Sequence, residues 1–454
     1  MTQNSTSRAL RVAIIGAGPA GIYAGNILHT KHPNVVIDLF DSLPAPYGLI
    51  RYGVAPDHPR IKGIVNSLQE MLGEGSIRFY GNVEFGVDLT LEDVRGHYHA
   101  VIFATGAIKD AALNIPGTEL DGSYGAADFV SWYDGHPDVP RTWPLTAEEV
   151  AVLGNGNVAL DVARVLAKHA DDMLKTDIPA NVYDGLKASP VTDVHVFGRR
   201  GPQQIKFTPI ELRELGEVED VDIVVYEEDF GDDWFDEDAE GVTNQHRVMA
   251  RIMNEWRERE RTGASRRLHL HFYHAPVEIL GADGKVVGMR FERTRPTGNG
   301  AVEGTGEHRE YELGAVYRAI GYFGTELPEV PFDAKHGVIR NNGGRVVDEA
   351  GKQVPGLYAT GWIKRGPVGL IGHTKSDALE TIENLLADIA DLADPVSNES
   401  ATVALAQRGV EFTDWQGWRK LNAHELALGA ADTSPVVRER VKVVSREEQV
   451  KISR

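Results

Sequence analysis

The 454-residue chain contains no cysteine. This absence excludes disulfide frameworks, cysteine-ligated zinc, iron–sulfur clusters, cysteine nucleophiles and redox-active dithiols. Long apolar runs are missing as well, since no stretch approaches the roughly 20 residues that a membrane-spanning helix needs. Met1 to Ala9 include one arginine and no apolar core, so no secretory signal is predicted. We therefore expect a cytoplasmic protein without an integral membrane segment.

Basic residues are scarce relative to acidic ones. The chain has 47 Lys and Arg against 67 Asp and Glu, a formal net charge of −20, which argues against a nucleic-acid partner. The acid is concentrated, because residues 211–240 hold fifteen carboxylates and one base and the other 424 residues carry only −6. Residues 434–454 hold six bases against three acids. The net charge therefore does not exclude an acidic protein as partner.

The first of two glycine-rich turns lies near the N-terminus. A β-branched run at residues 10–15 leads into GAGPAG, and a helix-permissive stretch at 22–28 follows. In G-x-G-x-x-G, the first glycine (Gly16) permits a tight turn, the second (Gly18) lets the backbone approach a pyrophosphate, and the third (Gly21) packs helix against strand. The N-terminus of the following helix presents N–H groups to the phosphates. This pattern predicts a dinucleotide site.

An acidic residue completes the first unit. Asp41 ends the second strand, residues 35–40, where a carboxylate accepts hydrogen bonds from ribose hydroxyls. The pattern alone does not distinguish FAD from NAD. Its N-terminal position favours FAD by analogy with flavoproteins that bind two dinucleotides.

The second glycine-rich turn has a different partner. The strand at residues 150–153 leads into Gly154-Asn155-Gly156-Asn157-Val158-Ala159, the G-x-G-x-x-A variant of the same fingerprint. Where the first unit has an acid, the strand at 194–198 leads into Arg199 and Arg200. An acid would repel a 2′-phosphate, whereas guanidinium groups bind it in bidentate contacts. The unit therefore predicts NADP binding, the alternative being a solvated arginine pair.

The order of these units predicts an insertion. After the second unit the chain has another strand, at residues 357–359, and a third glycine-rich segment. We predict an FAD-binding domain from residues 1–108 and 325–454, including a C-terminal tail from about 395, and an NADP-binding domain at 109–324.

Five longer segments resemble the adrenodoxin reductase-like ferredoxin–NADP reductases, most closely their actinobacterial members. The segments, in chain order, are Leu43–Lys62, Gly154–Arg164, Phe197–Pro202, Phe207–Leu215 and Gly361–Gly372. The resemblance implies an α/β fold with two Rossmann-like dinucleotide-binding domains, the NADP domain inserted into the FAD domain. At two positions where the family often has Glu and Trp, this chain has Asp41 and Tyr47.

The resemblance also implies cofactor contacts. For FAD they are Ala20, Asp41, Leu49, Phe85, Trp362, Gly369, Leu370 and Ile371, beside the glycines of the first turn. For NADP they are Asn155, Asn157, Val158, Arg199, Arg200, Glu211 and Gly369, beside the glycines of the second turn.

Two residues are candidates for a direct effect on hydride transfer. His58 would place a polar N–H near the nicotinamide or flavin, and Glu211 would orient the nicotinamide carboxamide or ribose and pair with His58. The alternatives are a surface or structural histidine and a solvated carboxylate at a helix start. Hydride transfer depends on alignment more than on acid–base chemistry. No metal site is predicted.

These features imply an oxidoreductase that moves electrons between NADPH and a ferredoxin-type iron–sulfur protein through FAD. FAD accepts two electrons as hydride and releases them singly. Without cysteine the chain holds no cluster, so the acceptor brings its own. The alternatives are another NADPH-dependent flavoprotein, monooxygenase-like or a diaphorase, and a non-enzymatic nucleotide-sensing flavoprotein. The lack of cysteine excludes a disulfide reductase. The sequence does not predict the oligomeric state.

Overall fold

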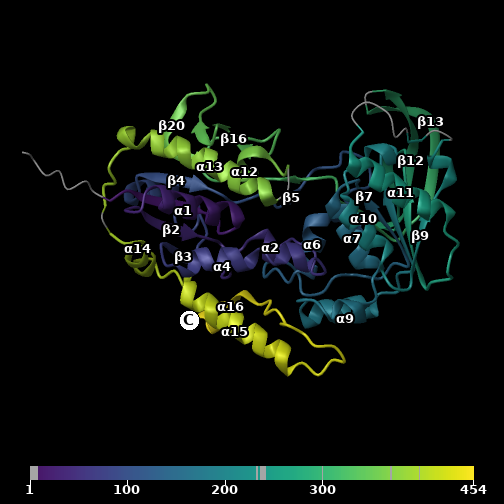
Figure 1. Ribbon diagram of the computed structural model, residues 1–454, viewed down its shortest axis with the longest axis horizontal. Helices are drawn as coiled ribbons and strands as arrows, with labels where there is room; N and C mark the ends of the chain where they lie inside the picture. Colours follow the sequence, from purple (N-terminus) through teal and green to yellow (C-terminus); the bar gives the residue numbers. More distant parts are fainter. Residues whose placement is uncertain (1–8, 232–233, 236–241, 299, 369–370, 398) are drawn as a thin grey trace, which may run out of the picture. The chain divides into compact units, whose positions relative to one another are not determined.

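The chain divides into two units, each organised around its own sheet (Figure 1). The structure, a computed structural model, describes residues 9–231, 234–235, 242–298, 300–368, 371–397 and 399–454. Unit 1 comprises Met1–Lys109, Asp134–Asp138 and Tyr322–Arg454, and unit 2 comprises Asp110–Tyr133 and Val139–Gly321. The chain thus leaves unit 1 after Lys109 and returns at Tyr322, with one short additional segment of unit 1 at 134–138.

Unit 1 contains an eight-stranded sheet whose centre is parallel. Its strand order is β18 (Asn341–Asn342), β19 (Arg345–Val347), β20 (Gln353–Ala359), β4 (Ala100–Phe103), β1 (Arg11–Ile15), β2 (Val36–Phe40), β3 (Ile77–Gly81), β21 (Thr413–Asp414). The strands from β20 to β3 are parallel, and the outer strands pair antiparallel. Parallel pairing follows from the crossover helices, which carry the chain back to the same end of the sheet.

Helices cover both faces of this sheet. On one face lie α1 (Pro19–Lys31), α4 (Val65–Gly73), α13 (Ile371–Ala387) and α15 (Trp415–Ala431). On the other lie α5 (Leu91–His97) and α14 (Ala401–Gln407). Alternate residues of β1 serve the two faces, Val12 and Ile14 the first and Ala13 and Ile15 the second. This two-sided burial explains why β1 is continuously apolar. The last helix is α16 (Arg446–Ser453).

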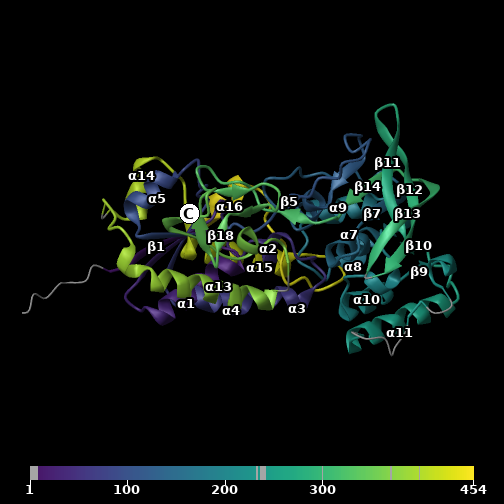
Figure 2. The same ribbon diagram turned by 90° about the horizontal axis from the view of Figure 1, so that it is seen from above.

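Unit 2 contains a six-stranded parallel sheet covered on one face by helices and on the other by a second sheet (Figure 2). The strand order is β6 (Ser123–Gly125), β14 (Ala315–Arg318), β7 (Glu149–Leu153), β8 (Asp193–Phe197), β10 (Arg266–His271), β9 (Val221–Val225). The covering helices are α6 (Ala126–Tyr133), α7 (Asn157–Ala167), α8 (Ala170–Met173), α9 (Ala180–Ala188), α10 (Pro209–Gly216) and α11 (Asn244–Glu258). The second sheet is antiparallel, β11 (His274–Ala282), β12 (Lys285–Gly298) and β13 (Ala301–Glu312).

The sequence from Leu268 to Arg293 predicts strands that turn at Ala282, Asp283 and Gly284, and the structure confirms this turn. Asp283 and Gly284 have φ of 49° and 78°, as a two-residue hairpin between β11 and β12 requires. β10, the first strand of this stretch, belongs to the parallel sheet and not to the hairpin. Strand β13 was not predicted, because its residues are mostly exposed and rich in Glu and Gly.

The acidic segment at residues 211–240 is partly neutralised by arginines of its own unit. Glu227 pairs with Arg257, Glu228 pairs with Arg309, and Asp229 accepts a hydrogen bond of 2.7 Å from Arg293. Residues 232–233 and 236–240 of this segment lie outside the described residues. The local excess of negative charge is therefore smaller than the sequence count.

A stack of rings lies on the face of the parallel sheet that meets the second sheet. Tyr226, His271, Phe197 and Phe291 stack in succession, with ring centroids 4.6, 4.4 and 4.1 Å apart. Such offset stacking adds to the energy of apolar burial.

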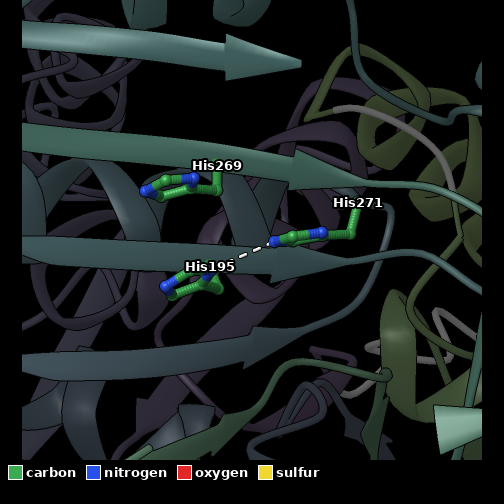
Figure 3. Close-up of side chains that lie close together, drawn as sticks. All are labelled: His195, His269 and His271. Atoms are coloured by element: carbon green, nitrogen blue, oxygen red, sulfur yellow. Dashed lines mark hydrogen bonds between the residues drawn. The ribbon is translucent and has the colours of Figure 1, made fainter. Parts of the chain in front are cut away.

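Two further histidines, His195 and His269, lie close to His271 (Figure 3). The rings of His195 and His269 stack at 4.3 Å, and His195 Nδ1 shares a hydrogen bond of 3.0 Å with His271 Nε2. His269 Nε2 lies 2.8 Å from Asp193 Oδ1, and its Nδ1 lies 2.8 Å from the hydroxyl of Tyr226. All three histidines are buried.

This ring layer makes unit 2 sensitive to acid. Burial lowers the pKa of His195 to about 3, that of His274 to about 4, and that of His271 well below the ordinary value. The unfolded chain binds a proton at each of these groups as the pH falls below about 6.5, whereas the folded chain does not. Each such histidine therefore costs about 1.4 kcal/mol of stability per pH unit between pH 6.5 and its folded pKa.

We predict that His195→Phe reduces the acid sensitivity of unit 2. Between pH 7 and pH 5 its free energy of unfolding falls by about 2 kcal/mol less than that of the unsubstituted protein, because one proton-binding group is gone. Urea unfolding followed by tryptophan fluorescence at both pH values measures this difference. His308→Phe, at an exposed position of β13, is the control and leaves the pH dependence unchanged. Equal losses for His195→Phe and the unsubstituted protein would contradict the assignment.

Candidate functional site

The first glycine turn joins β1 to α1 with no room for side chains. Gly16 has φ of +113°, and a Cβ there would lie 2.4 Å from the carbonyl oxygen of Ala104. A Cβ on Gly21 would lie 2.0 Å from the carbonyl oxygen of Gly16. Gly18 caps α1 without a side-chain hydrogen bond, and the first turn of α1 has no acidic residue. Its first N–H groups are therefore available to an anion such as a pyrophosphate.

Asp41 lies beside this turn, at the end of β2. Its carboxylate accepts hydrogen bonds from the backbone N–H of Ala17 at 2.6 Å and of Leu43 at 2.9 Å. Burial raises the pKa of Asp41 to about 6. Each carboxylate oxygen accepts more than one hydrogen bond, so both retain capacity for ribose hydroxyls.

The second glycine turn joins β7 to α7 in the same way. Gly154 has φ of +148°, and a Cβ there would lie 2.2 Å from the carbonyl oxygen of Ala319. A Cβ on Gly156 would meet no atom within 4 Å, so space remains in front of this residue. Gly156 caps α7 without a side-chain hydrogen bond. The Asn157 side chain accepts a hydrogen bond of 3.3 Å from the N–H of Thr208, which ties the turn to α10.

A buried polar atom without a hydrogen-bond partner among the described residues lies beside each turn. The hydroxyl of Thr105, next to Gly16, and the side-chain nitrogen of Asn155 are buried without a hydrogen-bond partner within the described part of the chain. Most buried polar groups in folded proteins are hydrogen-bonded. Together with the uncapped helices, these atoms show that the residues present fit one dinucleotide in each unit.

Arg199 and Arg200 follow β8 in a turn fixed through its backbone. The Thr294 hydroxyl donates to the carbonyl of Arg199 at 2.7 Å, and the N–H of Tyr273 donates to that of Arg200 at 3.3 Å. Neither guanidinium donates a hydrogen bond or forms an ion pair among the residues that the structure describes. Both are therefore available to a 2′-phosphate, whereas the equivalent place in unit 1 holds the acid Asp41.

The other predicted FAD residues have mixed surroundings. Ala20 contacts the turn at Gly361, since a Cβ on Gly361 would lie 2.6 Å from that of Ala20. Phe85 packs into the core against Phe103, with centroids 5.3 Å apart. Leu49 begins the short helix α2 (Leu49–Tyr52), and Trp362 begins α12 (Trp362–Arg365).

The remaining predicted contacts lie around the start of α13. Gly369 and Leu370 lie outside the described residues. Ile371 is the first residue of α13. In unit 2, Val158 packs partly against the core.

Sequence reasoning missed Asp377, which fixes the turn that carries Trp362. Its Oδ2 accepts from the N–H of Gly361 at 2.5 Å and from the Thr360 hydroxyl at 3.1 Å. Its Oδ1 lies 3.1 Å from the buried ammonium of Lys364. The available signal for Asp377 was Lys364, which follows the apolar residues Trp362 and Ile363. A lysine that is buried there requires an acidic partner.

His58 and Glu211 are both buried, with 5% and 7% of their surface exposed. A surface histidine and a solvated carboxylate are therefore wrong as alternative interpretations. His58 precedes α3 (Pro59–Lys62) in unit 1, and Glu211 lies in the first turn of α10 in unit 2. Their pairing joins different units and stays a prediction.

The ring layer contains a histidine cluster with metal-ligand chemistry. One nitrogen of each of His195, His269 and His271 lies within 4.8 Å of the others. Imidazole binds a metal through a lone pair in the ring plane. The His195 and His269 rings stack face to face at an interplanar angle of 12°, so these two rings do not direct lone pairs at one ion. This geometry favours hydrogen-bonded packing.

The sequence matches one known protein family and near full-length relatives from other organisms. The family described as "Pyridine nucleotide-disulphide oxidoreductase" matches residues 10–200. "NADPH-ferredoxin reductase FprA" of Mycobacterium tuberculosis is 36% identical over 462 residues, covering 98% of this chain and 99% of that protein. Mitochondrial "NADPH:adrenodoxin oxidoreductase" of Arabidopsis thaliana is 35% identical over 452 residues, covering 95% and 94%. The chain belongs to the adrenodoxin reductase-like ferredoxin–NADP reductases.

A solved structure of this family confirms the predicted fold class. The structure of Mycobacterium tuberculosis FprA in complex with NADPH matches with a TM-score of 0.91 and 36% identity, covering 98% of this chain and 100% of that one. The fold is α/β with two Rossmann-like dinucleotide-binding domains, one inserted into the other. Among the described helices, none has the length and apolar character needed to cross a membrane.

We predict that FAD affinity depends on the ionisation of Asp41. Ribose hydroxyls donate to the ionised carboxylate, so FAD binding lowers the pKa of Asp41 and affinity falls as the pH drops through about 6. The FAD dissociation constant of the apoprotein therefore rises about tenfold between pH 7 and pH 5. Flavin fluorescence quenching measures this constant.

Two variants of Asp41 control this measurement. Asp41→Asn binds FAD more weakly at pH 7 and loses the dependence on pH, whereas Asp41→Glu keeps it. A dissociation constant of the unsubstituted apoprotein that does not change between pH 7 and pH 5 would show that Asp41 does not bind the ribose.

Proposed function

We propose that this protein is an FAD-dependent NADPH–ferredoxin reductase that transfers electrons between NADPH and a ferredoxin-type iron–sulfur protein. One observation carries the proposal. Each unit has a glycine turn before a helix without a side-chain cap, and the next strand is followed by Asp41 in unit 1 and by Arg199 and Arg200 in unit 2. An acid suits the ribose of FAD, and paired guanidiniums suit the 2′-phosphate of NADPH. The names of the near full-length relatives support the same activity.

The two units then divide the cofactors between them. We assign FAD to the domain formed by residues 1–108 and 325–454, and NADP(H) to the domain at 109–324. FAD, when bound, accepts a hydride and releases electrons singly to a one-electron acceptor. The absence of cysteine means that the iron–sulfur centre belongs to the partner.

The protein's own residues supply binding and orientation. The N-termini of α1 and α7 direct their N–H groups and positive dipole at the two pyrophosphates. His58 and Glu211 orient the reacting rings as buried polar groups. Because hydride transfer depends on alignment, their loss slows turnover without abolishing it.

The test is NADPH-driven reduction of cytochrome c with and without an added ferredoxin. The proposal predicts a severalfold higher rate with ferredoxin, because the iron–sulfur protein relays single electrons to the cytochrome. The stimulation should weaken as ionic strength rises, since docking to an acidic ferredoxin relies on opposite charge.

The same assay distinguishes the alternatives. A rate with ferredoxin equal to the direct rate would identify a diaphorase and refute the proposal. NADPH-dependent oxygen consumption on an organic substrate would favour a monooxygenase. A flavin spectrum without NADPH turnover would favour a nucleotide sensor.

A further inference from the structure

The C-terminal tail, from about residue 395, contacts the loop of unit 1 at residues 43–59. We propose that Trp418 of α15 is a positioning residue for FAD, acting through Tyr47 on the first glycine turn. This inference rests on the proposed function, because it assigns FAD to that turn. Figure 1 shows α15 in yellow near the C-terminus, and α15 belongs to the same unit as α1 and α2.

Tyr47 has a backbone conformation that a non-glycine residue rarely adopts. Its φ is +87°, and only 1% of its surface is exposed. Such strain persists only where the surroundings over-determine it. The N–H of Tyr47 donates to the carbonyl of Ala17 at 2.8 Å, and its hydroxyl accepts from Trp418 Nε1 at 3.2 Å. The two rings also meet edge to face, 5.5 Å between centroids.

The conformation of Tyr47 determines where the next residue lies. Gly48 has φ of +49°, and a Cβ on Gly48 would lie 3.1 Å from the Cα of Gly18. Gly18 is the glycine at which the backbone approaches the pyrophosphate. The Trp418 hydrogen bond is therefore connected to the cofactor site through Tyr47, Gly48 and Gly18, all of them in direct contact.

A buried ion pair fixes the same helix to the same loop. Glu425 of α15 and Arg51 of α2 pair in bidentate fashion, with 0% and 5% of their surface exposed. The Arg51 guanidinium also lies over the Trp418 ring, 5.1 Å from its centroid. Removing one member of a buried pair is strongly destabilising. The ion pair secures the fold, so its removal would not test the positioning role. Trp418→Phe and Tyr47→Phe leave the ion pair in place, and the two variants taken together isolate the hydrogen bond between their side chains.

The basic residues of the tail have structural partners as well. Lys442 is buried and donates to the carbonyl of Arg51 at 2.9 Å and to Asp134 at 3.3 Å. Arg446 pairs with Asp138 at 2.7 Å. The basic excess of residues 434–454 thus serves in part to attach the tail to the rest of unit 1.

The test compares two tryptophans of the same helix. Trp418→Phe keeps an aromatic ring and removes the N–H donor. Trp415→Phe, the control, makes the same change at a partly buried tryptophan beside Gly73 of α4. Apoprotein of each variant is titrated with FAD by flavin fluorescence, and visible circular dichroism reports the surroundings of the bound flavin. Thermal unfolding is measured in parallel.

We expect Trp418→Phe to raise the FAD dissociation constant by up to about tenfold, because FAD binding must then restore the loop conformation that the hydrogen bond holds, at a cost limited by the net worth of that bond. The flavin dichroism changes with it, and Trp415→Phe alters neither quantity. Tyr47→Phe removes the other partner of the same bond, so the double variant binds FAD no more weakly than the weaker single variant.

Four outcomes would overturn the inference. If the unsubstituted apoprotein binds no FAD, the proposed function fails with it. If it binds FAD and Trp418→Phe binds equally well with unchanged dichroism, only the positioning role fails. Equal weakening by Trp418→Phe and Trp415→Phe would mean that the tail acts through general stability. Additive losses in the double variant would mean that the two residues act separately.

Discussion

A single steric constraint recurs in both units: the chain turns from strand to helix so tightly that a side chain is excluded. A Cβ at Gly16 or Gly154 would lie 2.4 or 2.2 Å from a carbonyl oxygen of a neighbouring strand end. The tight turn starts each helix directly beyond the carboxyl end of its sheet, with its first N–H groups uncapped. The dipole and the free donors of that helix then make an anion site at one defined edge of the sheet.

Charge distinguishes two sites that the backbone makes alike. Asp41 after β2 has a raised pKa of about 6 and two backbone donors, so it is a partly buried acceptor rather than a solvated acid. Arg199 and Arg200 after β8 keep their guanidiniums available because other atoms fix their backbone. The net charge of −20 does not determine which ligand either site binds, because charges farther away than about a Debye length are largely screened.

The local part of this design was predictable from the sequence. Each glycine fingerprint, its strand and helix, and the charged residue after the next strand lie within a few tens of residues of one another. They can therefore be recognised from the sequence. Contacts between distant segments were not predictable, as with the hydrogen bond from Trp418 to Tyr47, which are 371 residues apart. Neither was the burial of His58 and Glu211, because a loop or helix-start position does not reveal what packs over it. Strand β13 escaped because an exposed strand has no apolar alternation.

The central claim is that NADPH bound in unit 2 reduces FAD bound in unit 1, and that the charge beside each glycine turn selects the nucleotide. Anaerobic titration of the FAD-loaded protein, followed at the flavin absorption band, tests it most directly. The account predicts that one equivalent of NADPH bleaches the flavin, that NADH does so far more slowly, and that Arg199→Ala with Arg200→Ala narrows this difference. A flavin that NADPH leaves oxidised, or equal rates with both nucleotides before and after the substitutions, would contradict it.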